Sequence, residues 1–291
     1  MIEVAKMAKY LVLFNPLANN KRGEEDAHRV ESVITDGEFD YKSVLEVGSF
    51  QKLIDELPAD VTPVLAGGDG SINYFINDVD CDRLEREVLY FPAGSGNDFM
   101  HDVSEDGSVK YVSLNKYVKN LPWVEVNGMK KHFINGIGYG IDGYCCEVAD
   151  KIRETSEKPI NYTSIAIKGL LFFFKPVNAT VIIDGVERKF DHAWLAPAMN
   201  GRFYGGGMNA TPSQNRLDSE GKLSTMIFTG RNKLRTLMIF PSIFKGEHVK
   251  HTDVVKVLSG KKIEVTFDRP CALQIDGETV LNVTSYKAYR D

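Results

Sequence analysis

Residues 61–77, VTPVLAGGDGSINYFIN, are the part of the sequence from which the fold is most directly inferred. The apolar start predicts a short buried strand, and the apolar residues spaced over 72–76 predict the beginning of a helix. Between the two, three glycines surround a carboxylate, Asp69. Glycine lets a backbone approach a ligand closely, and a helix N-terminus offers unpaired N–H groups to an anion. The unit therefore predicts a phosphate-binding turn with Ser71 as the helix cap, and an ordinary connecting turn is the alternative.

The sequence before and after this unit alternates between strand and helix patterns. This alternation predicts a doubly wound parallel α/β sheet, in which ligands bind at the C-terminal ends of the strands. A second glycine turn, in FPAGSGNDFM at 91–100, also follows a predicted strand, so both turns are expected at the same sheet edge. The expected strands cover 9–15, 41–46, 61–65 and 88–91, and the other expected helices cover 24–35 and 50–57.

From about Trp123 the pattern changes to short alternating stretches separated by hairpin turns such as VNGM and IDGV. This pattern predicts a β-rich domain, a sandwich or an open barrel. The expected domains are a nucleotide-binding domain over 1–122 and a β-rich domain over 123–283. Residues from about 284 to 291 are expected to return to the first domain, and the active site is expected in the cleft between the two.

Two apolar segments interrupt the β pattern, YTSIAIKGLLFFFK at 162–175 and NKLRTLMIFPSIFK at 232–245. Both predict helices that line a cleft for an apolar acceptor or touch a bilayer, with core-facing helices as the alternative.

The charge distribution is uneven along the 291 residues. Residues 1–122 carry 12 Lys and Arg against 22 Asp and Glu, a net charge of −10, whereas the remainder carries +5. A basic half suits an anionic membrane surface or a phosphate-bearing ligand. No apolar run approaches the length of about twenty residues needed for a transmembrane helix, and no signal peptide is apparent. The four cysteines form neither a metal spacing nor a disulfide framework, which indicates a reducing compartment, so a cytoplasmic protein is expected.

Several catalytic motifs are absent from the sequence. There is no GxxxxGK[ST] loop, no HExxH, no HRD-type catalytic loop, no CxxC pair and no nucleophile elbow. These absences give hydrolase and metalloprotease mechanisms no support.

Five motifs occur in an order that resembles the diacylglycerol kinase catalytic family. That family includes bacterial lipid kinases and sphingosine kinases, and it shares its phosphate-binding turn with NAD kinases and phosphofructokinases. Two departures are that Ser71 stands where Thr is more usual, and Tyr74 where many relatives carry Glu. The motifs are GGDGS at 67–71, PAGSGNDF at 92–99, NGIGYGID at 135–142, GGGMNATP at 205–212 and LQIDGE at 273–278.

The resemblance implies a lipid kinase that transfers the γ-phosphate of ATP, with Mg²⁺, to a lipid hydroxyl, most simply that of diacylglycerol. Asp69 is then expected to act in catalysis as a metal or metal-water ligand near the phosphates, or else to hold the turn. Asn15 and Asn73 are expected to hydrogen-bond the nucleotide, and Asn97 to pack behind the second turn. The phosphate cradle is expected to consist of Gly67, Gly68, Gly70, Ser71, Gly94, Ser95 and Gly96.

The resemblance also implies a base from the C-terminal half. Glu278 is the expected base with Asp276 assisting, since positions two apart in a pleated strand share a face; a plain hairpin turn is the alternative. A structural Mg²⁺ is expected in the loop at 216–223, with Asp218 and Glu220 as ligands. Asp142 is expected either to face the interdomain cleft or to occupy a β-bulge.

Other functions remain open from the sequence. They are a kinase of another lipid or a sphingoid base, a soluble enzyme like NAD kinase, and a nucleotide-binding regulator without catalysis. The expected partner is a lipid substrate at the membrane surface, with peripheral membrane association, no transmembrane segment and no nucleic acid. A homodimer is also left open.

Overall fold

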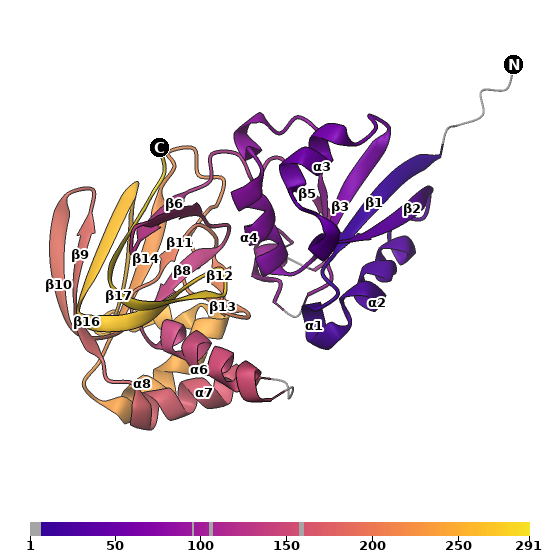
Figure 1. Cartoon of the computed structure of the whole chain (residues 1–291). Helices are drawn as coiled ribbons and strands as arrows, with labels where there is room; N and C mark the ends of the chain where they lie inside the picture. The colour runs from indigo at the N-terminus through magenta and orange to yellow at the C-terminus, as the bar shows by residue number, and fades with distance from the viewer. Residues whose placement is uncertain (1–6, 95, 105–106, 157–159) are drawn as a thin grey trace, which may run out of the picture. The chain divides into compact units, whose positions relative to one another are not determined.

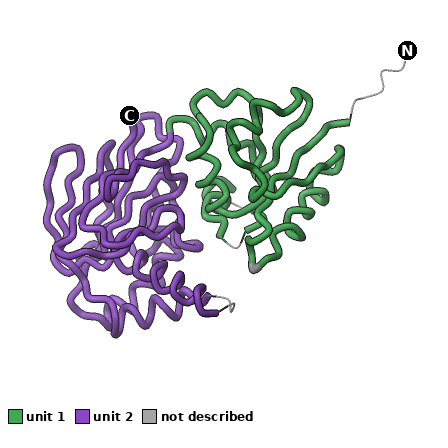
Figure 2. The backbone as a smooth tube through the Cα atoms, viewed as in Figure 1, with its two compact units in different colours: residues 1–120 green, residues 121–291 purple. Residues whose placement is uncertain are grey.

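The computed structural model describes residues 7–94, 96–104, 107–156 and 160–291. The chain divides into two compact units, unit 1 over residues 1–120 and unit 2 over residues 121–291 (Figure 2). The division lies two residues before the domain boundary expected from the sequence.

Unit 1 is built on a sheet with the strand order β2-β1-β3-β4-β5, in which the first four strands are parallel (Figure 1). The predicted α/β class is confirmed. The strands are β1 (Ala8–Phe14), β2 (Gly37–Ser43), β3 (Val61–Gly67), β4 (Leu89–Pro92) and the antiparallel β5 (Val112–Ser113). The α-helices are α1 (Ala18–Lys21), α2 (Gly23–His28), α3 (Phe50–Glu56), α4 (Asp69–Asp78) and α5 (Asp98–Val103); short 3₁₀ turns cover Arg29–Ser32, Val44–Glu46 and Cys81–Arg83.

The strand order of unit 1 reverses between β1 and β3. The chain passes from β1 outward to β2 on one side, then returns to β3 and β4 on the other. Phe14, Ala66 and Phe91 pair across neighbouring strands, so β1, β3 and β4 end side by side. Open α/β sheets bind ligands outside the carboxyl ends of the strands at such a reversal. The fold thus places Asn15 and both glycine turns where a ligand is expected.

Alternate residues of the unit 1 strands face opposite sides of the sheet, as the pleat requires. Val12 and Val64 pack in one buried cluster with Ala27 and Val30 of the α2 region. On the other side Tyr90 of β4 contacts the ring of Phe99 in α5, with the ring centroids 5.6 Å apart. Both faces of the sheet are therefore buried, which explains the continuous apolar runs in the sequence.

Unit 2 contains a long antiparallel sheet whose described strands follow the order β7-β6-β17-β16-β8-β11-β14-β10-β9, with β15 paired to β14. One half of β16 pairs with β8 and the other half with β9, so the sheet closes on itself. The strands are β6 (Trp123–Val126), β7 (Met129–His132), β8 (Gly136–Tyr139), β9 (Val177–Ile183), β10 (Val186–Leu195), β11 (Ala198–Met199), β14 (Leu223–Thr229), β15 (Val255–Gly260), β16 (Lys262–Ile275) and β17 (Glu278–Tyr289), plus a small hairpin of β12 (Phe203–Tyr204) and β13 (Met208–Asn209).

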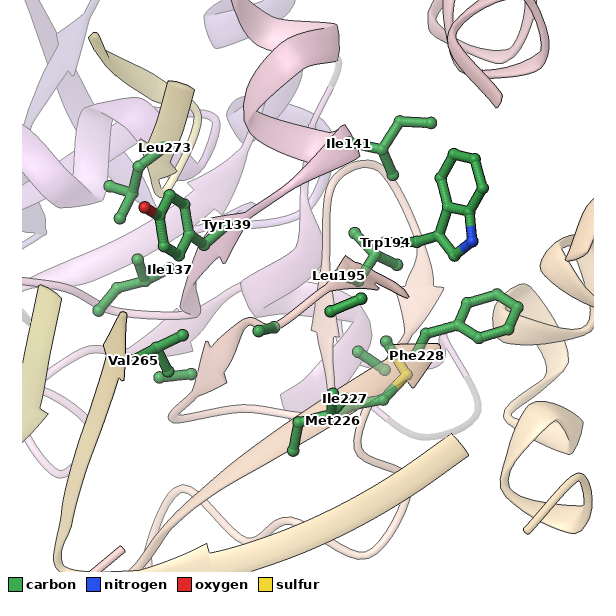
Figure 3. Close-up of a cluster of buried hydrophobic side chains, with 14 of the residues drawn as sticks. Ile137, Tyr139, Ile141, Trp194, Leu195, Met226, Ile227, Phe228, Val265 and Leu273 are labelled. Carbon is green, nitrogen blue, oxygen red and sulfur yellow. The ribbon is translucent and has the colours of Figure 1, made fainter. Parts of the chain in front are cut away.

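Helical segments accompany this sheet at one end of unit 2 (Figure 1). They confirm the predicted β-rich domain with helical insertions. The interior is filled by inward-facing side chains such as Tyr139, Trp194, Phe228 and Leu273, all fully buried (Figure 3). The helical segments are α6 (Ile141–Thr155), α7 (Tyr162–Lys168), a π-turn η4 (Gly169–Phe173), α8 (Lys233–Ile239), and two 3₁₀ turns η5 (Phe240–Lys245) and η6 (Glu247–Lys250). No helix among the described residues is long and apolar enough to cross a membrane.

Two features of unit 2 differ from the sequence-based expectation. The C-terminal strand β17 runs between β6 and β16, within unit 2, because its residues Val283, Tyr286 and Ala288 fill the core of that unit. The helix α6 was not expected from the sequence. Its buried residues, among them Ile141, Cys145 and Ala149, recur at helical spacing, but four glycines at 136–143 obscure that pattern.

Candidate functional site

The first glycine turn joins β3 directly to α4. Gly68 is the N-cap of the helix, and Asp69 is its first residue. The expectation that Ser71 caps this helix is therefore wrong, because the N-cap is Gly68, three residues earlier. Ser71 lies in the first turn instead, where its hydroxyl is so close to Gly67 that a Cβ at Gly67 would lie 2.2 Å from it.

The two glycine turns pack against each other through their backbones. The Asp69 N–H donates to the Gly96 carbonyl (3.2 Å), and the Ala93 N–H donates to the Gly67 carbonyl (2.9 Å). A Cβ at Gly94 would lie 2.5 Å from the Gly68 Cα, closer than real Cβ contacts come. Glycine is thus required by this close approach, independently of any ligand.

Gly70 is different from these glycines. A Cβ at Gly70 would meet nothing within 4 Å, so no packing contact explains the glycine there. It lies in the first turn of α4, where N–H groups lack partners within the helix. The open space beside it suits a bound anion.

The carboxylate of Asp69 joins the two turns. Its Oδ2 accepts from the Asp98 N–H (2.8 Å) and its Oδ1 from the Phe99 N–H (3.0 Å), so it caps α5 across a sequence distance of about thirty residues. The residue is only 9% exposed. This geometry matches the alternative in which Asp69 holds the turn.

Behind the second turn lies a polar pair that the sequence only partly indicated. The Asn97 Nδ2 donates to the Gly94 carbonyl (2.8 Å), and the Tyr90 hydroxyl donates to the Gly67 carbonyl (3.0 Å). Burial raises the pKa of Tyr90 well above its usual value, so the hydroxyl stays a neutral donor. Tyr90 was missed because a tyrosine inside an apolar strand is indistinguishable from an ordinary core residue.

The other residues that were expected to bind the nucleotide lie in different surroundings. Asn15 follows β1, and its side-chain oxygen accepts from the Leu17 N–H (3.0 Å), which shapes the loop at the end of that strand. Asn73 lies on α4 and is 1% exposed, so it belongs to the interior of unit 1. Ser95 lies outside the described residues.

In unit 2, Asp276 and Gly277 form a two-residue hairpin turn. Both have positive φ, +46° and +96°, and Ile275 pairs with Glu278 across the turn. The argument that Asp276 and Glu278 share one face of a pleated strand therefore fails, because Asp276 is not in a strand. The plain-turn alternative describes the backbone correctly.

The two carboxylates of this hairpin have different environments. Asp276 accepts three backbone N–H bonds, from Ile134 (2.6 Å), Asn135 (2.9 Å) and Gly136 (3.0 Å). Glu278 is exposed over 52% of its side chain and forms an ion pair with Lys131. Asp276 thus fixes the hairpin to the 134–136 segment, while Glu278 presents a solvent-accessible carboxylate.

Further buried polar groups hold the 134–136 segment from its other side. Arg216, which is 7% exposed, donates to the Ile134 carbonyl (3.2 Å) and to the Asn135 Oδ1 (3.0 Å). The Asn200 Nδ2 also donates to the Ile134 carbonyl (2.7 Å). Hydrogen-bond networks in which every group has a partner are rigid, so the 134–136 segment holds the hairpin that carries Glu278 in a fixed position.

Models of two protein families match the chain. The model described as the diacylglycerol kinase catalytic domain matches residues 9–119, and that described as the YegS C-terminal NAD kinase beta sandwich-like domain matches residues 135–287. The second covers more than half of the chain. The chain therefore belongs to the family of that second model, and it carries the diacylglycerol kinase catalytic domain before it. The resemblance inferred from the motifs is confirmed.

Curated relatives of this family are similar over most of the chain. A Mycobacterium tuberculosis (strain ATCC 25618 / H37Rv) protein named "Diacylglycerol kinase" is 26% identical over 215 residues, covering 69% of this chain but only 65% of the relative. A Bacillus subtilis (strain 168) protein named "Putative lipid kinase YtlR" is 25% identical, covering 77% of this chain and 75% of the relative. The match thus spans just under two thirds of the mycobacterial protein.

Solved structures agree at the level of the fold. The crystal structure of a protein described as "a putative diacylglycerol kinase" from Bacillus anthracis str. Sterne has a TM-score of 0.65 at 16% identity, covering 100% of this chain and 95% of that one. A second structure from the same organism has a TM-score of 0.57 at 17% identity, covering 98% and 94%. At this identity the likeness establishes the fold alone.

In the loop at 216–223, where the family resemblance implied a structural magnesium site, both expected ligands have partners within the protein. Asp218 Oδ2 accepts from the Lys222 N–H (2.8 Å) and closes a turn, and Glu220 forms an ion pair with the Lys222 ammonium (2.5 Å). Across the described parts of the chain, no group of three or more His, Cys, Asp or Glu side chains is gathered for a metal. Mg²⁺ also accepts main-chain carbonyl oxygens and water, so a magnesium ion at this loop stays a prediction.

Asp142 lies in the first turn of α6, not in a β-bulge. Its Oδ2 accepts from the Tyr204 hydroxyl (2.9 Å) and its Oδ1 from the Gly143 N–H (2.9 Å). Burial raises its pKa from 3.8 to about 6, against the lowering effect of these hydrogen bonds. Unit 2 therefore contains a buried carboxyl group whose ionisation is costly.

This pKa predicts how the stability of unit 2 depends on pH. Below pH 3.8 the carboxyl is neutral in both the folded and the unfolded state. Between about pH 4 and 6 only the unfolded chain loses the proton, which lowers the free energy of unfolding by roughly 3 kcal/mol. Above about pH 6 both states are ionised, and this carboxyl lowers the free energy of unfolding no further. Asp142→Asn keeps the bond from the Gly143 N–H to its side-chain oxygen, whereas the bond to Tyr204 reverses, because the amide donates to the Tyr204 oxygen. Urea unfolding at several pH values should show the variant more stable than wild type at pH 7, without its decline between pH 4 and 6. An unchanged decline would contradict the assignment.

Proposed function

We propose that the protein is an ATP-dependent lipid kinase that phosphorylates a lipid hydroxyl, with diacylglycerol as the acceptor and phosphatidic acid as the product. The observation that carries the proposal is the pair of interlocked glycine turns at the strand-order reversal of unit 1, in a chain of the diacylglycerol kinase family.

The donor half of the reaction is proposed for unit 1. The N–H groups of Asp69 and Ser71 are bonded within the protein, so the start of α4 at Gly70, with its backbone N–H and the positive dipole end of the helix, is proposed to face the ATP phosphates. Asp69 is proposed as a positioning residue, because its carboxylate fixes the second turn against the first. ATP is proposed to be used as its magnesium complex. The phosphates and retained water molecules would supply ligands to such an ion, so no cluster of protein carboxylates is needed.

The acceptor half is proposed for unit 2. Glu278 is proposed as the base that takes the proton from the lipid hydroxyl, because it is the accessible carboxylate of the hairpin. The hydroxyl oxygen then forms a bond to the γ-phosphorus while the bond from that phosphorus to the β-phosphate bridging oxygen breaks, and ADP leaves. Asp276 is proposed as a positioning residue, because its oxygens are used to hold the hairpin.

The test is the transfer of labelled γ-phosphate from ATP with Mg²⁺ to three acceptors offered in parallel. These are diacylglycerol in detergent micelles, a mixed bacterial lipid extract, and NAD. Label that migrates as phosphatidic acid is the expected result. Label on another lipid would replace the acceptor, and label on NAD alone would overturn the lipid assignment. ATP binding without transfer to any acceptor would overturn the kinase activity and favour a regulator.

A further inference from the structure

Two helical segments of unit 2 that are distant in the sequence pack against each other and form one structural element. The π-turn η4, which follows α7, contacts α8, and the two lie side by side at one end of the unit (Figure 1). The Lys233 ammonium, in the first turn of α8, donates to the Leu171 carbonyl of η4 (2.9 Å). The two segments are far apart in sequence, so their association is produced by the fold.

Large apolar side chains protrude from this element into solvent. Phe172 is 72% exposed, Phe173 is 66%, Leu234 is 67% and Met238 is 74%. Ile167 of α7 and Phe244 of η5 are also exposed. We call these six side chains the apolar patch. Single exposed apolar residues are ordinary, but exposed apolar groups collected on adjoining segments mark an interaction surface.

The same segments are basic and lack acids. Residues 160–175 and 231–245 carry six Lys and Arg and no Asp or Glu. Arg235 pairs with Asp253 of the neighbouring loop (2.6 Å). A cavity of about 420 Å³ beside the patch is lined by Phe173 together with Lys175, Arg269 and one acid, Glu147. The apolar patch is therefore framed by positive charge.

We propose that the apolar patch inserts into the interfacial region of an anionic lipid bilayer while the framing cations contact its headgroups. Basic residues around protruding aromatic and aliphatic side chains fit such a surface, and each basic residue near it adds about 1 kcal/mol of attraction. This surface deepens the proposed function, since a lipid acceptor resides in a bilayer. The binding itself requires neither ATP nor catalysis.

A second copy of the chain is a poorer occupant of the patch. A two-fold dimer places the same surface of each protomer against its equivalent, so the basic segments of one copy would face those of the other, and of their six basic residues Arg235 is paired with an acid, Asp253. An anionic bilayer instead neutralises them. Charge complementarity therefore favours the bilayer.

The experiment measures co-sedimentation of the full chain, without ATP, with vesicles of phosphatidylcholine plus phosphatidylglycerol and with vesicles of phosphatidylcholine alone. Wild type is expected to bind the anionic vesicles more tightly, and less so as salt is raised. The double variant Phe172→Ser, Phe173→Ser is expected to bind roughly a hundred-fold more weakly, since each ring contributes about a tenfold gain when buried. Both rings lie mostly in solvent, so the variant should fold, which circular dichroism checks.

Val186→Ser is the matched control. Val186 is 53% exposed and starts β10, a strand outside the patch. Unchanged binding by Val186→Ser together with weak binding by the double serine variant supports the proposal. Equal binding by wild type and the double variant overturns it, as does an equal loss in both variants or no binding by wild type.

A charge variant separates the two components of the surface. Lys168→Gln with Lys245→Gln should reduce binding to the anionic vesicles several-fold and flatten its salt dependence, while binding to phosphatidylcholine alone stays the same. No change on anionic vesicles would overturn the role of the cations. Vesicle binding that persists in a protein without transfer activity would refute the proposed kinase reaction and leave this surface intact. Transfer to micellar diacylglycerol by a protein that does not bind vesicles would refute the membrane surface and leave the proposed kinase reaction intact.

Discussion

Asp69→Ala is expected to abolish phosphoryl transfer and to lower the free energy of unfolding by roughly 3–5 kcal/mol. The carboxylate accepts the N–H groups of Asp98 and Phe99, and it holds the second glycine turn against the first. Alanine leaves two buried N–H groups without an acceptor, and each charge-assisted bond is typically worth about 1.5–3 kcal/mol. Transfer from ATP and urea unfolding measure the two effects.

Asp78→Ala is the control for this variant. Asp78 ends the same helix, α4, and accepts from the Ser49 hydroxyl (3.1 Å) and from the backbone N–H of Phe50 at the start of α3. Its loss should lower stability to a similar degree but leave the glycine turns in place. Turnover per folded molecule should therefore survive in Asp78→Ala and disappear in Asp69→Ala. If both variants keep full turnover, Asp69 has no part in positioning the turns for transfer.

Glu278→Gln is expected to reduce turnover by about 10²–10⁴-fold with ATP binding unchanged. The amide is close in size to the carboxylate but cannot accept a proton, and general-base catalysis contributes rate factors of about this size. Because the side chain is 52% exposed, the substitution should alter stability little. Steady-state transfer and equilibrium ATP binding distinguish a lost base from a lost nucleotide site.

Glu264→Gln is the matched control for the base. Glu264 lies on β16 and pairs with Lys262 (2.6 Å), so it is also a partly exposed, ion-paired glutamate of unit 2. Its substitution should leave turnover near the wild-type value. Normal turnover in Glu278→Gln would remove Glu278 from the base role and would turn attention to other acids of unit 2.

The sequence predicted the fold class because both units follow local patterns. Continuous apolar runs before the glycine turns marked buried parallel strands, and short alternating runs with turn residues marked the β-rich unit. The two apolar insertions were also located correctly as helices α7 and α8 with their following turns. The helix α6 was not predicted, because its apolar spacing begins inside a glycine-rich segment.

The candidate site was harder to predict than the fold, because its contacts join distant parts of the chain. No local pattern shows that Asp69 caps a helix some thirty residues further on, or that Asp276 binds the backbone of Ile134. The sequence DGE reads the same whether the aspartate side chain is accessible or accepts hydrogen bonds from backbone N–H groups, so the sequence cannot distinguish the two environments. The φ of +46° at Asp276 and the pairing of Ile275 with Glu278 show that the aspartate occupies a turn.

The pairing of β17 with β6 has a consequence for synthesis of the protein. Asp276 and Ile134, which it binds, are 142 residues apart, and the same late hairpin completes the sheet around β6 and β16. Unit 1 pairs only strands from within its first 120 residues, so it can fold while the ribosome is still translating unit 2. Until residues 278–289 emerge, β6 and β16 keep open edges that invite pairing with other chains. The nascent second half is therefore the part of the molecule most dependent on chaperones.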